Sequence, residues 1–98
     1  MARFDVYSTA DSSLVLNLQS NAFENVNTRI VAPLLLKSTY DRPINRANPE
    51  FVIEREHYVL LTHFLAAVMT SELRQKIDNL EHEHYKISSA PDMLFYGF

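Results

Sequence analysis

The sequence predicts a small α+β domain in which strands dominate, and three observations support this class. Polar and apolar residues alternate at the N-terminus, several short apolar runs follow, and apolar residues recur at helical spacing only near the C-terminus. The chain has 98 residues, enough for one hydrophobic core and too few for two. We therefore expect one domain over residues 1–98, with about five or six strands followed by a C-terminal helix.

The first two strands are expected to form a hairpin. Residues 3–8 alternate between polar and apolar side chains, which predicts a half-buried strand. Residues 9–12 have turn composition, residues 14–19 carry a leucine at every second position, and residues 20–28 are a polar loop. The alternation predicts that the outward side chains of the first strand are Asp5 and Tyr7, and that the inward ones of the pair are Phe4, Val6, Leu14, Leu16 and Leu18.

A nearly continuous apolar run at residues 29–36 predicts a strand that is buried on both faces. Pro33 lies within this run and has no amide hydrogen, so it must occupy a bulge, a bend or an edge. Residues 37–49 are rich in proline, asparagine and charge and are expected to be irregular. Residues 51–53 and 58–62 are then expected to pair as a second hairpin with a polar tip between them.

The last third of the chain is predicted to turn from strand to helix. Residues 65–70 are expected to add one short strand. Beyond it, Leu73, Ile77 and Leu80 recur at helical spacing. This periodicity predicts a helix over residues 71–86.

Composition excludes several classes of function. The chain carries 9 Lys and Arg against 12 Asp and Glu, which gives a net charge of −3 and argues against a nucleic-acid or anionic-membrane surface. Cysteine is absent, so disulfides, thiolate metal ligands and thiol nucleophiles are excluded. There is no long apolar run that could span a bilayer, and the N-terminus does not resemble a secretory signal. We expect a cytoplasmic protein without a cofactor.

Glycine is unusually scarce, since the only one is Gly97, next to the last residue. Tight turns that need a positive φ are therefore expected to use asparagine, the next most tolerant residue. The sequence has seven asparagines, at positions 17, 21, 25, 27, 45, 48 and 79.

Two polar clusters are candidates for chemistry. The histidines at 82 and 84 alternate with glutamates, but residues two apart on a helix point in roughly opposite directions, so we interpret the cluster as a solvated polar face and expect no metal site. Residues 54–57, Glu-Arg-Glu-His, could supply an acid, a base and a cation for RNA cleavage. A charged hairpin tip is the more common origin of such a cluster.

The C-terminus, Met93–Phe98, reads Met-Leu-Phe-Tyr-Gly-Phe and is strongly apolar. Chain ends are usually polar and frayed unless something holds them. One interpretation is that this segment docks into the core of its own domain. The other is that it is presented to a partner, with Tyr96 supplying rigid contact area and Gly97 allowing a close approach of the backbone.

Several segments together resemble the CcdB family of toxins from toxin–antitoxin pairs. No single segment is specific, but their order and spacing agree over nearly the whole chain. The resembling segments are Arg3–Tyr7, Leu16–Asn21, Asn27–Leu34, Val59–Thr62 and Leu94–Phe98.

The resemblance implies a fold, a target and two partners. The implied fold is an SH3-like β-barrel with a C-terminal helix, in a homodimer. The implied activity is non-enzymatic: the dimer inserts into the A subunits of DNA gyrase and traps the cleaved-DNA complex. A cognate antitoxin of the CcdA type would neutralise the toxin with a disordered tail that folds on its surface.

The family's functional positions map onto this sequence residue by residue. The aromatic residue third from the end, which stacks on an arginine of gyrase, corresponds to Tyr96. The other positions to which the resemblance gives a role in gyrase binding are Gly97, Phe98, Asp92, Phe4, Ala22 and Phe23. Tyr96 stands where the best-known members have tryptophan.

Pro91 departs from the family pattern, in which this segment is an unbroken helix. Proline in a helix interior removes a hydrogen bond and clashes with the preceding turn. Ser89 could instead cap a new helix with Pro91 in its first turn. We therefore predict that the helix is kinked or broken near residues 88–90. Two alternative functions stay open: an endoribonuclease toxin of the same barrel fold, and a dimeric remnant without toxicity.

Overall fold

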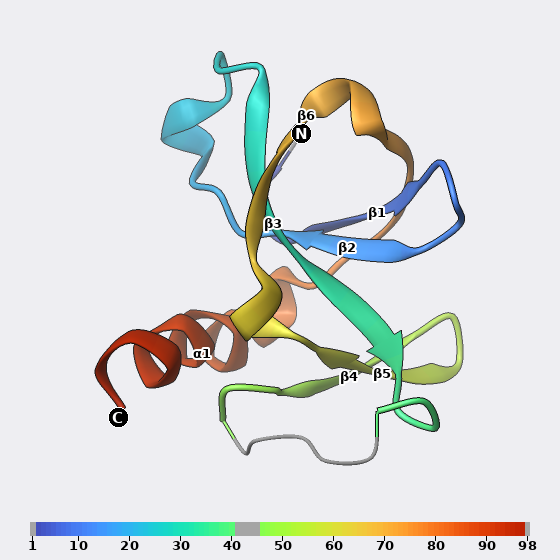
Figure 1. Cartoon of the computed structure of the whole chain (residues 1–98), viewed down its shortest axis with the longest axis vertical. Helices are drawn as coiled ribbons and strands as arrows, with labels where there is room; N and C mark the ends of the chain where they lie inside the picture. The colour runs from blue at the N-terminus through green and yellow to red at the C-terminus, as the bar shows by residue number, and fades with distance from the viewer. Residues whose placement is uncertain (1, 41–45, 98) are drawn as a thin grey trace.

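The computed structural model describes residues 2–40 and 46–97, which form a curled antiparallel sheet with one long helix at the C-terminal end (Figure 1). The strands pair in the order β4-β5-β3-β2-β1-β7, and β6 pairs with β3 beside β5. The strand-dominated α+β class predicted from the sequence is confirmed. The strands are β1 (Asp5–Thr9), β2 (Leu14–Asn17), β3 (Thr28–Leu36), β4 (Glu50–Ile53), β5 (Glu56–Leu60), β6 (Ala66–Met69) and β7 (Leu73–Asn79).

Short 3-10 turns connect several of these strands. They are η1 (Asn21–Phe23), η2 (Thr62–Phe64), η3 (Thr70–Glu72) and η4 (Glu81–Glu83), and the last leads into helix α1 (His84–Tyr96). Part of the segment predicted to be irregular, residues 41–45, lies outside the described residues. No helix within the described ranges is both long and apolar enough to cross a membrane.

The pairing of β3 agrees with the prediction that Pro33 occupies a bulge, a bend or an edge. Its first half pairs with β6 through residues 28–31, and its second half pairs with β5 through residues 34–36. Pro33 lies between these two partners, and its carbonyl accepts a hydrogen bond from the Leu61 amide at 2.9 Å. In an antiparallel strand the N–H and C=O of one residue point to the same edge. The edge at which Pro33 lacks an N–H is therefore the one where β6 gives way to β5.

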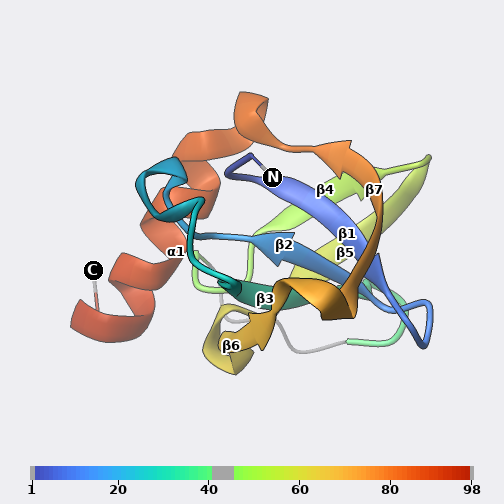
Figure 2. The same ribbon diagram turned by 90° about the horizontal axis from the view of Figure 1, so that it is seen from above.

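The core lies between the concave face of the sheet and α1 (Figure 2). The prediction that Asp5 and Tyr7 point outward is wrong, because both are buried along with Phe4 and Val6. The Asp5 carboxylate is enclosed by polar partners, the Ala2 amide, Asn79 and Lys76, and the Tyr7 hydroxyl donates to it. Alternation in the sequence of β1 therefore does not mean exposure of its second face. The core residues are Phe4, Val6, Leu16, Ala32, Leu34, Phe51, Ile53, Leu60, Leu80 and Ile87.

The helix predicted over residues 71–86 is also wrong. Leu73–Asn79 is β7, which pairs with β1, and the helix begins only at His84. The register between β1 and β7 shifts twice, between Val6 and Tyr7 and between Tyr7 and Thr9. Such bulges put extra residues into a strand and break its two-residue alternation, so the apolar spacing of β7 imitates a helix.

Helix α1 runs continuously through Pro91, so the predicted break near residues 88–90 does not occur. Ile87 and Ala90 are almost fully buried just before the proline. Packing of this face therefore holds the helix in place where the proline removes one backbone hydrogen bond.

The positive-φ positions differ from the prediction as well. Among the described residues, the non-glycine positions with positive φ are Phe4, Ser12, Arg46, Glu54 and Arg55, and no asparagine is among them. Four of the asparagines, at positions 17, 21, 48 and 79, instead make hydrogen bonds through their side-chain amides. Asn17, for example, donates from Nδ2 to the Ala2 carbonyl and accepts the Gln19 amide at Oδ1.

The turn between β4 and β5 allows the cost of positive φ at non-glycine residues to be measured. Glu54 and Arg55 have φ values of 50° and 67°, as the two central residues of a type I′ turn require, and this turn strongly favours glycine at its second position. We expect Arg55→Gly to raise the free energy of unfolding by about 0.5–1 kcal/mol, measured by chemical denaturation. Arg55→Ala removes the same side chain but keeps Cβ, so it should give no gain; equal stability of the two variants would contradict this account.

Candidate functional site

The described part of the apolar C-terminal segment, residues 93–97, does not dock into the core of its own domain. Phe95 and Tyr96 are 64% and 69% exposed, and both lie in the last turn of α1. The segment is therefore the end of a helix rather than a loose peptide, and the side chains of Phe95 and Tyr96 are largely exposed. Phe98 lies outside the described residues.

Gly97 ends α1 in the left-handed conformation. Its φ is 80°, and its amide donates to the Met93 carbonyl at 3.0 Å. No heavy atom lies within 4 Å of the position that a Cβ would take, so a side chain is disfavoured here by the backbone angle and not by crowding. The single glycine thus has a structural role, which is to end the helix directly after Tyr96.

The first half of α1 is attached firmly to the sheet. Besides the burial of Ile87 and Ala90, the Lys86 ammonium donates to the Glu50 carbonyl at 2.6 Å and lies 4.8 Å from the centre of the Phe51 ring. These contacts anchor the root of the helix while its end projects from the sheet (Figure 1).

Asp92 and Tyr96 are four residues apart on α1, so they lie on the same face of the helix. Asp92 is exposed, as is Tyr96. The structure therefore brings these two predicted partner-binding residues together at the free end of the helix.

Ala22 and Phe23 are on η1, and both are exposed, Phe23 by 57%. Ser20 caps this turn by accepting the Ala22 amide at Oγ. Beside it lies an apolar groove of about 410 Å³. Its lining residues are Leu18, Gln19, Ser20, Phe23, Val26 and Ile30.

Arg29, which is 5% exposed, holds the loop that follows η1. Its guanidinium donates to the carbonyls of Glu24, Val26 and Thr28. A buried cation that satisfies several carbonyls at once keeps this glycine-free loop in one conformation.

Phe4, which was also predicted to bind the partner, is 6% exposed and belongs to the core. The Arg3 guanidinium covers its ring at 4.7 Å from the centre. Its ring is therefore not available at the surface, in contrast to Phe23 and Tyr96. In Figure 1, η1 lies at the upper left and the C-terminal end of α1 at the lower left, toward opposite ends of the longest axis of the molecule, and both lie on the left in Figure 2.

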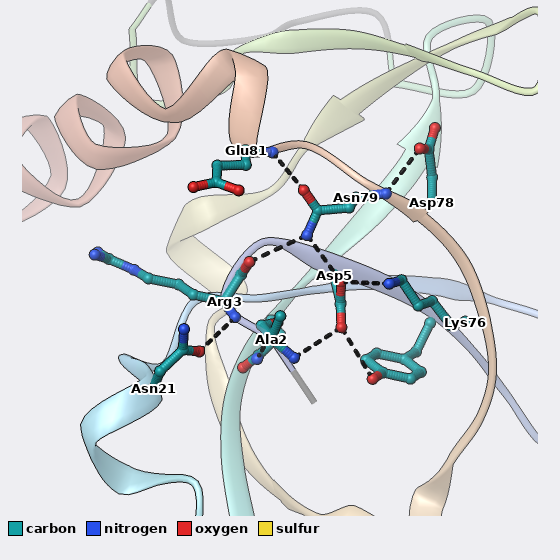
Figure 3. A network of polar contacts seen from close by, with 10 residues as sticks. Ala2, Arg3, Asp5, Asn21, Lys76, Asp78, Asn79 and Glu81 are labelled. Carbon is teal, nitrogen blue, oxygen red and sulfur yellow. Dashed lines mark hydrogen bonds and ion pairs between the residues drawn. The ribbon is translucent and has the colours of Figure 1, made fainter.

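A buried carboxylate, Asp5, organises the polar contacts between the N-terminal segment, β1 and β7 (Figure 3). Its oxygens accept from the Ala2 amide at 2.8 Å and from Asn79 Nδ2 at 2.8 Å, and Lys76 Nζ lies at 3.3 Å. Burial, the largest single influence, raises the pKa of Asp5, but the hydrogen bonds and the lysine together hold it below its usual value of 3.8. The Tyr7 hydroxyl also donates to this carboxylate.

This lowered pKa predicts how stability depends on pH. A carboxyl whose pKa is lower in the folded state stabilises the fold fully above its unfolded pKa, and this contribution is lost as pH falls through the folded pKa. At neutral pH we expect Asp5→Asn to lower the free energy of unfolding by about 2–3 kcal/mol. When urea unfolding is followed from about pH 5 to pH 2, the free energy of unfolding of the native protein should fall more steeply than that of Asp5→Asn. Parallel stability curves for the two proteins would show that the pKa of Asp5 is the same in the folded and unfolded states.

The charged hairpin tip does not form an evident catalytic arrangement. Glu54 and Arg55 are the turn itself, whereas His57 lies on β5, where its Nδ1 is 2.6 Å from Glu50 Oε2. Hydrogen bonds from Lys37 and then from His57 lower the pKa of Glu50. Within residues 2–40 and 46–97, no group of three or more His, Asp or Glu side chains is placed to hold a metal ion.

Some residues of this surface were not predicted from the sequence. Phe95 is as exposed as Tyr96, and Arg29 and Asn79 support the elements that carry the exposed residues. The exposure of Phe95 could have been suspected from the apolar chain end. The contacts of Arg29 and Asn79 had no signal in the sequence, because they depend on carbonyls that only the fold brings near.

Comparison with known families finds one matching family model, described as CcdB protein, over residues 3–97. No curated protein matches the chain.

Proposed function

The chain belongs to the CcdB family, and from this membership we propose that it is a toxin that poisons DNA gyrase. The family supports the broader assignment, a toxin of a toxin–antitoxin module. The narrower proposal is that the protein binds the A subunit of gyrase, traps the complex in which DNA is cleaved, and catalyses no reaction itself.

One observation carries this proposal: the aromatic end of α1 is exposed on a helix whose root is anchored. Tyr96 and Phe95 present rings at the surface, and Gly97 ends the helix directly behind them. A ring over a guanidinium contributes about 0.5–2 kcal/mol, more when water is excluded. Tyr96 is the residue that we propose stacks on an arginine of gyrase, with Asp92 beside it on the same helix face and Gly97 and Phe98 completing the contact.

The proposed contact surface has a second part on η1. Phe23 and Ala22 are exposed, and η1 lies toward the opposite end of the longest axis from the end of α1, on the left of Figure 1 and Figure 2 as that end is. Phe4 supports this surface from the core instead of touching the partner. The partner surface therefore combines two short elements that are far apart in sequence.

We further propose that the protein acts as a homodimer in the cytoplasm and is neutralised by a CcdA-like antitoxin. Gyrase A is itself a dimer, so two copies of the helix end would engage a symmetric target together, which raises the apparent affinity. A disordered antitoxin tail that folds over the exposed rings would block the same contact.

The proposal is tested with purified protein, gyrase and supercoiled plasmid. We expect double-strand cleavage of the plasmid to accumulate with protein concentration once gyrase is denatured by detergent, and we expect none when gyrase is omitted. The same protein is incubated with RNA in parallel. Cleavage of RNA that is lost in Arg55→Ala or His57→Ala, without DNA cleavage, would replace this proposal with the endoribonuclease alternative.

A further inference from the structure

A chain of hydrogen bonds connects η1, which carries one part of the proposed partner surface, to η4, the turn that leads into the root of α1 (Figure 3). Asn21, the first residue of η1, accepts the Arg3 amide at Oδ1, 2.7 Å away. The Arg3 carbonyl accepts from Asn79 Nδ2 at 3.3 Å. Asn79 Oδ1 in turn accepts the Glu81 amide at 2.9 Å, at the start of η4, which leads into α1.

The orientation of the Asn79 amide is determined by its partners. The Glu81 amide can only donate, so it requires the oxygen of Asn79. The Asp5 carboxylate and the Arg3 carbonyl can only accept, so they require the nitrogen. Both hydrogens and the oxygen of this side chain are thus used, and neither aspartate nor alanine could make the same set of bonds.

The main chain next to Arg3 is also held by hydrogen bonds of Phe4. The Phe4 amide donates to the Asn17 carbonyl at 2.8 Å, and the Phe4 carbonyl accepts the Leu80 amide at 2.9 Å. The N-terminal segment therefore lies between η1 and the root of α1 and is bonded to both sides. Phe4 anchors it in the core through its buried ring.

We propose that Asn21, the Arg3 main chain and Asn79 form a positioning bridge, which holds η1 and the root of α1 in one relative arrangement. This inference rests on the proposed function for its purpose: Phe23 and Tyr96 are presented to the partner as one preorganised surface. Preorganised contacts avoid the ordering cost that separate, mobile elements would incur on binding. Asn21 and Asn79 are positioning residues in this account and need not touch the partner.

Asn21 offers the cleaner test because it is exposed, so its replacement removes one bond without opening the core. Asn21→Ala removes the acceptor for the Arg3 amide. Asn21→Asp keeps an oxygen at the same position and serves as the matched control. Both variants are expected to melt within about 3 °C of the native protein, because a single exposed hydrogen bond contributes little to stability.

The first measurement does not involve gyrase. The chain has no cysteine, so spin labels can be placed at Asn25→Cys, after η1, and at Ser88→Cys, on α1, and the labelled chain can be diluted with unlabelled protein. We expect the distribution of distances between the labels to broaden about twofold in Asn21→Ala and to keep its native width in Asn21→Asp. An unchanged distribution in Asn21→Ala would overturn the bridge.

The second measurement is affinity for the isolated gyrase A subunit. We expect Asn21→Ala to weaken binding about fivefold, with native affinity in Asn21→Asp and little further loss when Asn21→Ala is added to Phe23→Ala. Native affinity of Asn21→Ala despite broadened distances would overturn the role of the bridge in presentation. If the native protein does not bind gyrase A, the proposed function fails, and the label distances alone decide whether the bridge positions the two elements.

Discussion

Replacing Tyr96 by alanine is expected to abolish growth arrest in cells that express the protein and to remove gyrase-dependent DNA cleavage in vitro. The ring is 69% exposed, so its loss leaves the core intact, and the melting temperature should stay within about 2 °C of native. Truncation of an aromatic anchor costs about 2 kcal/mol or more, roughly a 30-fold loss of affinity at each site. In a dimer bound to a symmetric target, the loss at both sites lowers the apparent affinity further.

Tyr85 provides a matched control for this variant. It is 81% exposed and lies on the same helix, in the first turn instead of the last. Tyr85→Ala therefore removes the same side chain from the same element and should leave toxicity unchanged. Full toxicity of Tyr96→Ala, or an equal loss in Tyr85→Ala, would contradict the assignment of the contact to the helix end.

Pro91→Ala is expected to stabilise the fold more than any other single change proposed for this chain. Proline in a helix interior costs about 3 kcal/mol relative to alanine, because the hydrogen bond to the Ile87 carbonyl is missing and the ring crowds that turn. Part of this cost is offset because proline restricts the unfolded chain. We expect a gain of about 2 kcal/mol in the free energy of unfolding, or roughly 10 °C in melting temperature.

The control for Pro91→Ala is Ser88→Ala, an exposed position on the same helix that changes helix propensity without a proline. Its gain should not exceed about 0.5 kcal/mol. If Pro91→Ala gains no more than Ser88→Ala, the helix has already relaxed around the proline. Toxicity of Pro91→Ala should equal that of the native protein, because the helix already reaches Tyr96 without a break.

Most strands of the fold could be predicted from local sequence patterns. The leucines at every second position of β2 and the apolar run of β3 each matched the observed strands, as did the position of Pro33 at the gap between β6 and β5. These patterns are readable because each strand keeps a regular register with its neighbour. The β4–β5 hairpin was also predicted, with small shifts at its ends.

The failures share a cause, which is that the decisive contacts are not local. The two register shifts between β7 and β1 break the alternation by which β7 could be recognised as a strand. The burial of Asp5 could not be predicted, because β1 has the alternating pattern of a half-exposed strand but is buried on both faces. Helix α1 continues through Pro91 because distant residues pack against it, although local propensity predicts a break. The scarcity of glycine was visible, but the positive-φ positions within residues 2–40 and 46–97 use serine, arginine, glutamate and phenylalanine, not asparagine.

The candidate site was predictable in part. The apolar chain end with a single glycine left two interpretations open, docking into the core or presentation to a partner, and the exposed rings at the end of α1 favour the second. The assignment of Phe4 came from resemblance and could not reveal its burial. The bonds that connect η1 to the root of α1 depend on the fold and were invisible in the sequence.

Photo-crosslinking from the helix end determines whether Tyr96 lies against gyrase A in the complex. A benzophenone amino acid replaces Tyr96 in one preparation and Tyr85 in another, and each is irradiated with purified gyrase holoenzyme and DNA. We expect a covalent adduct with the A subunit from position 96 and no adduct from position 85. Two results would contradict this: an adduct from position 85 alone, or no adduct from position 96 while the protein still promotes DNA cleavage. Either would mean that another surface of the protein binds gyrase.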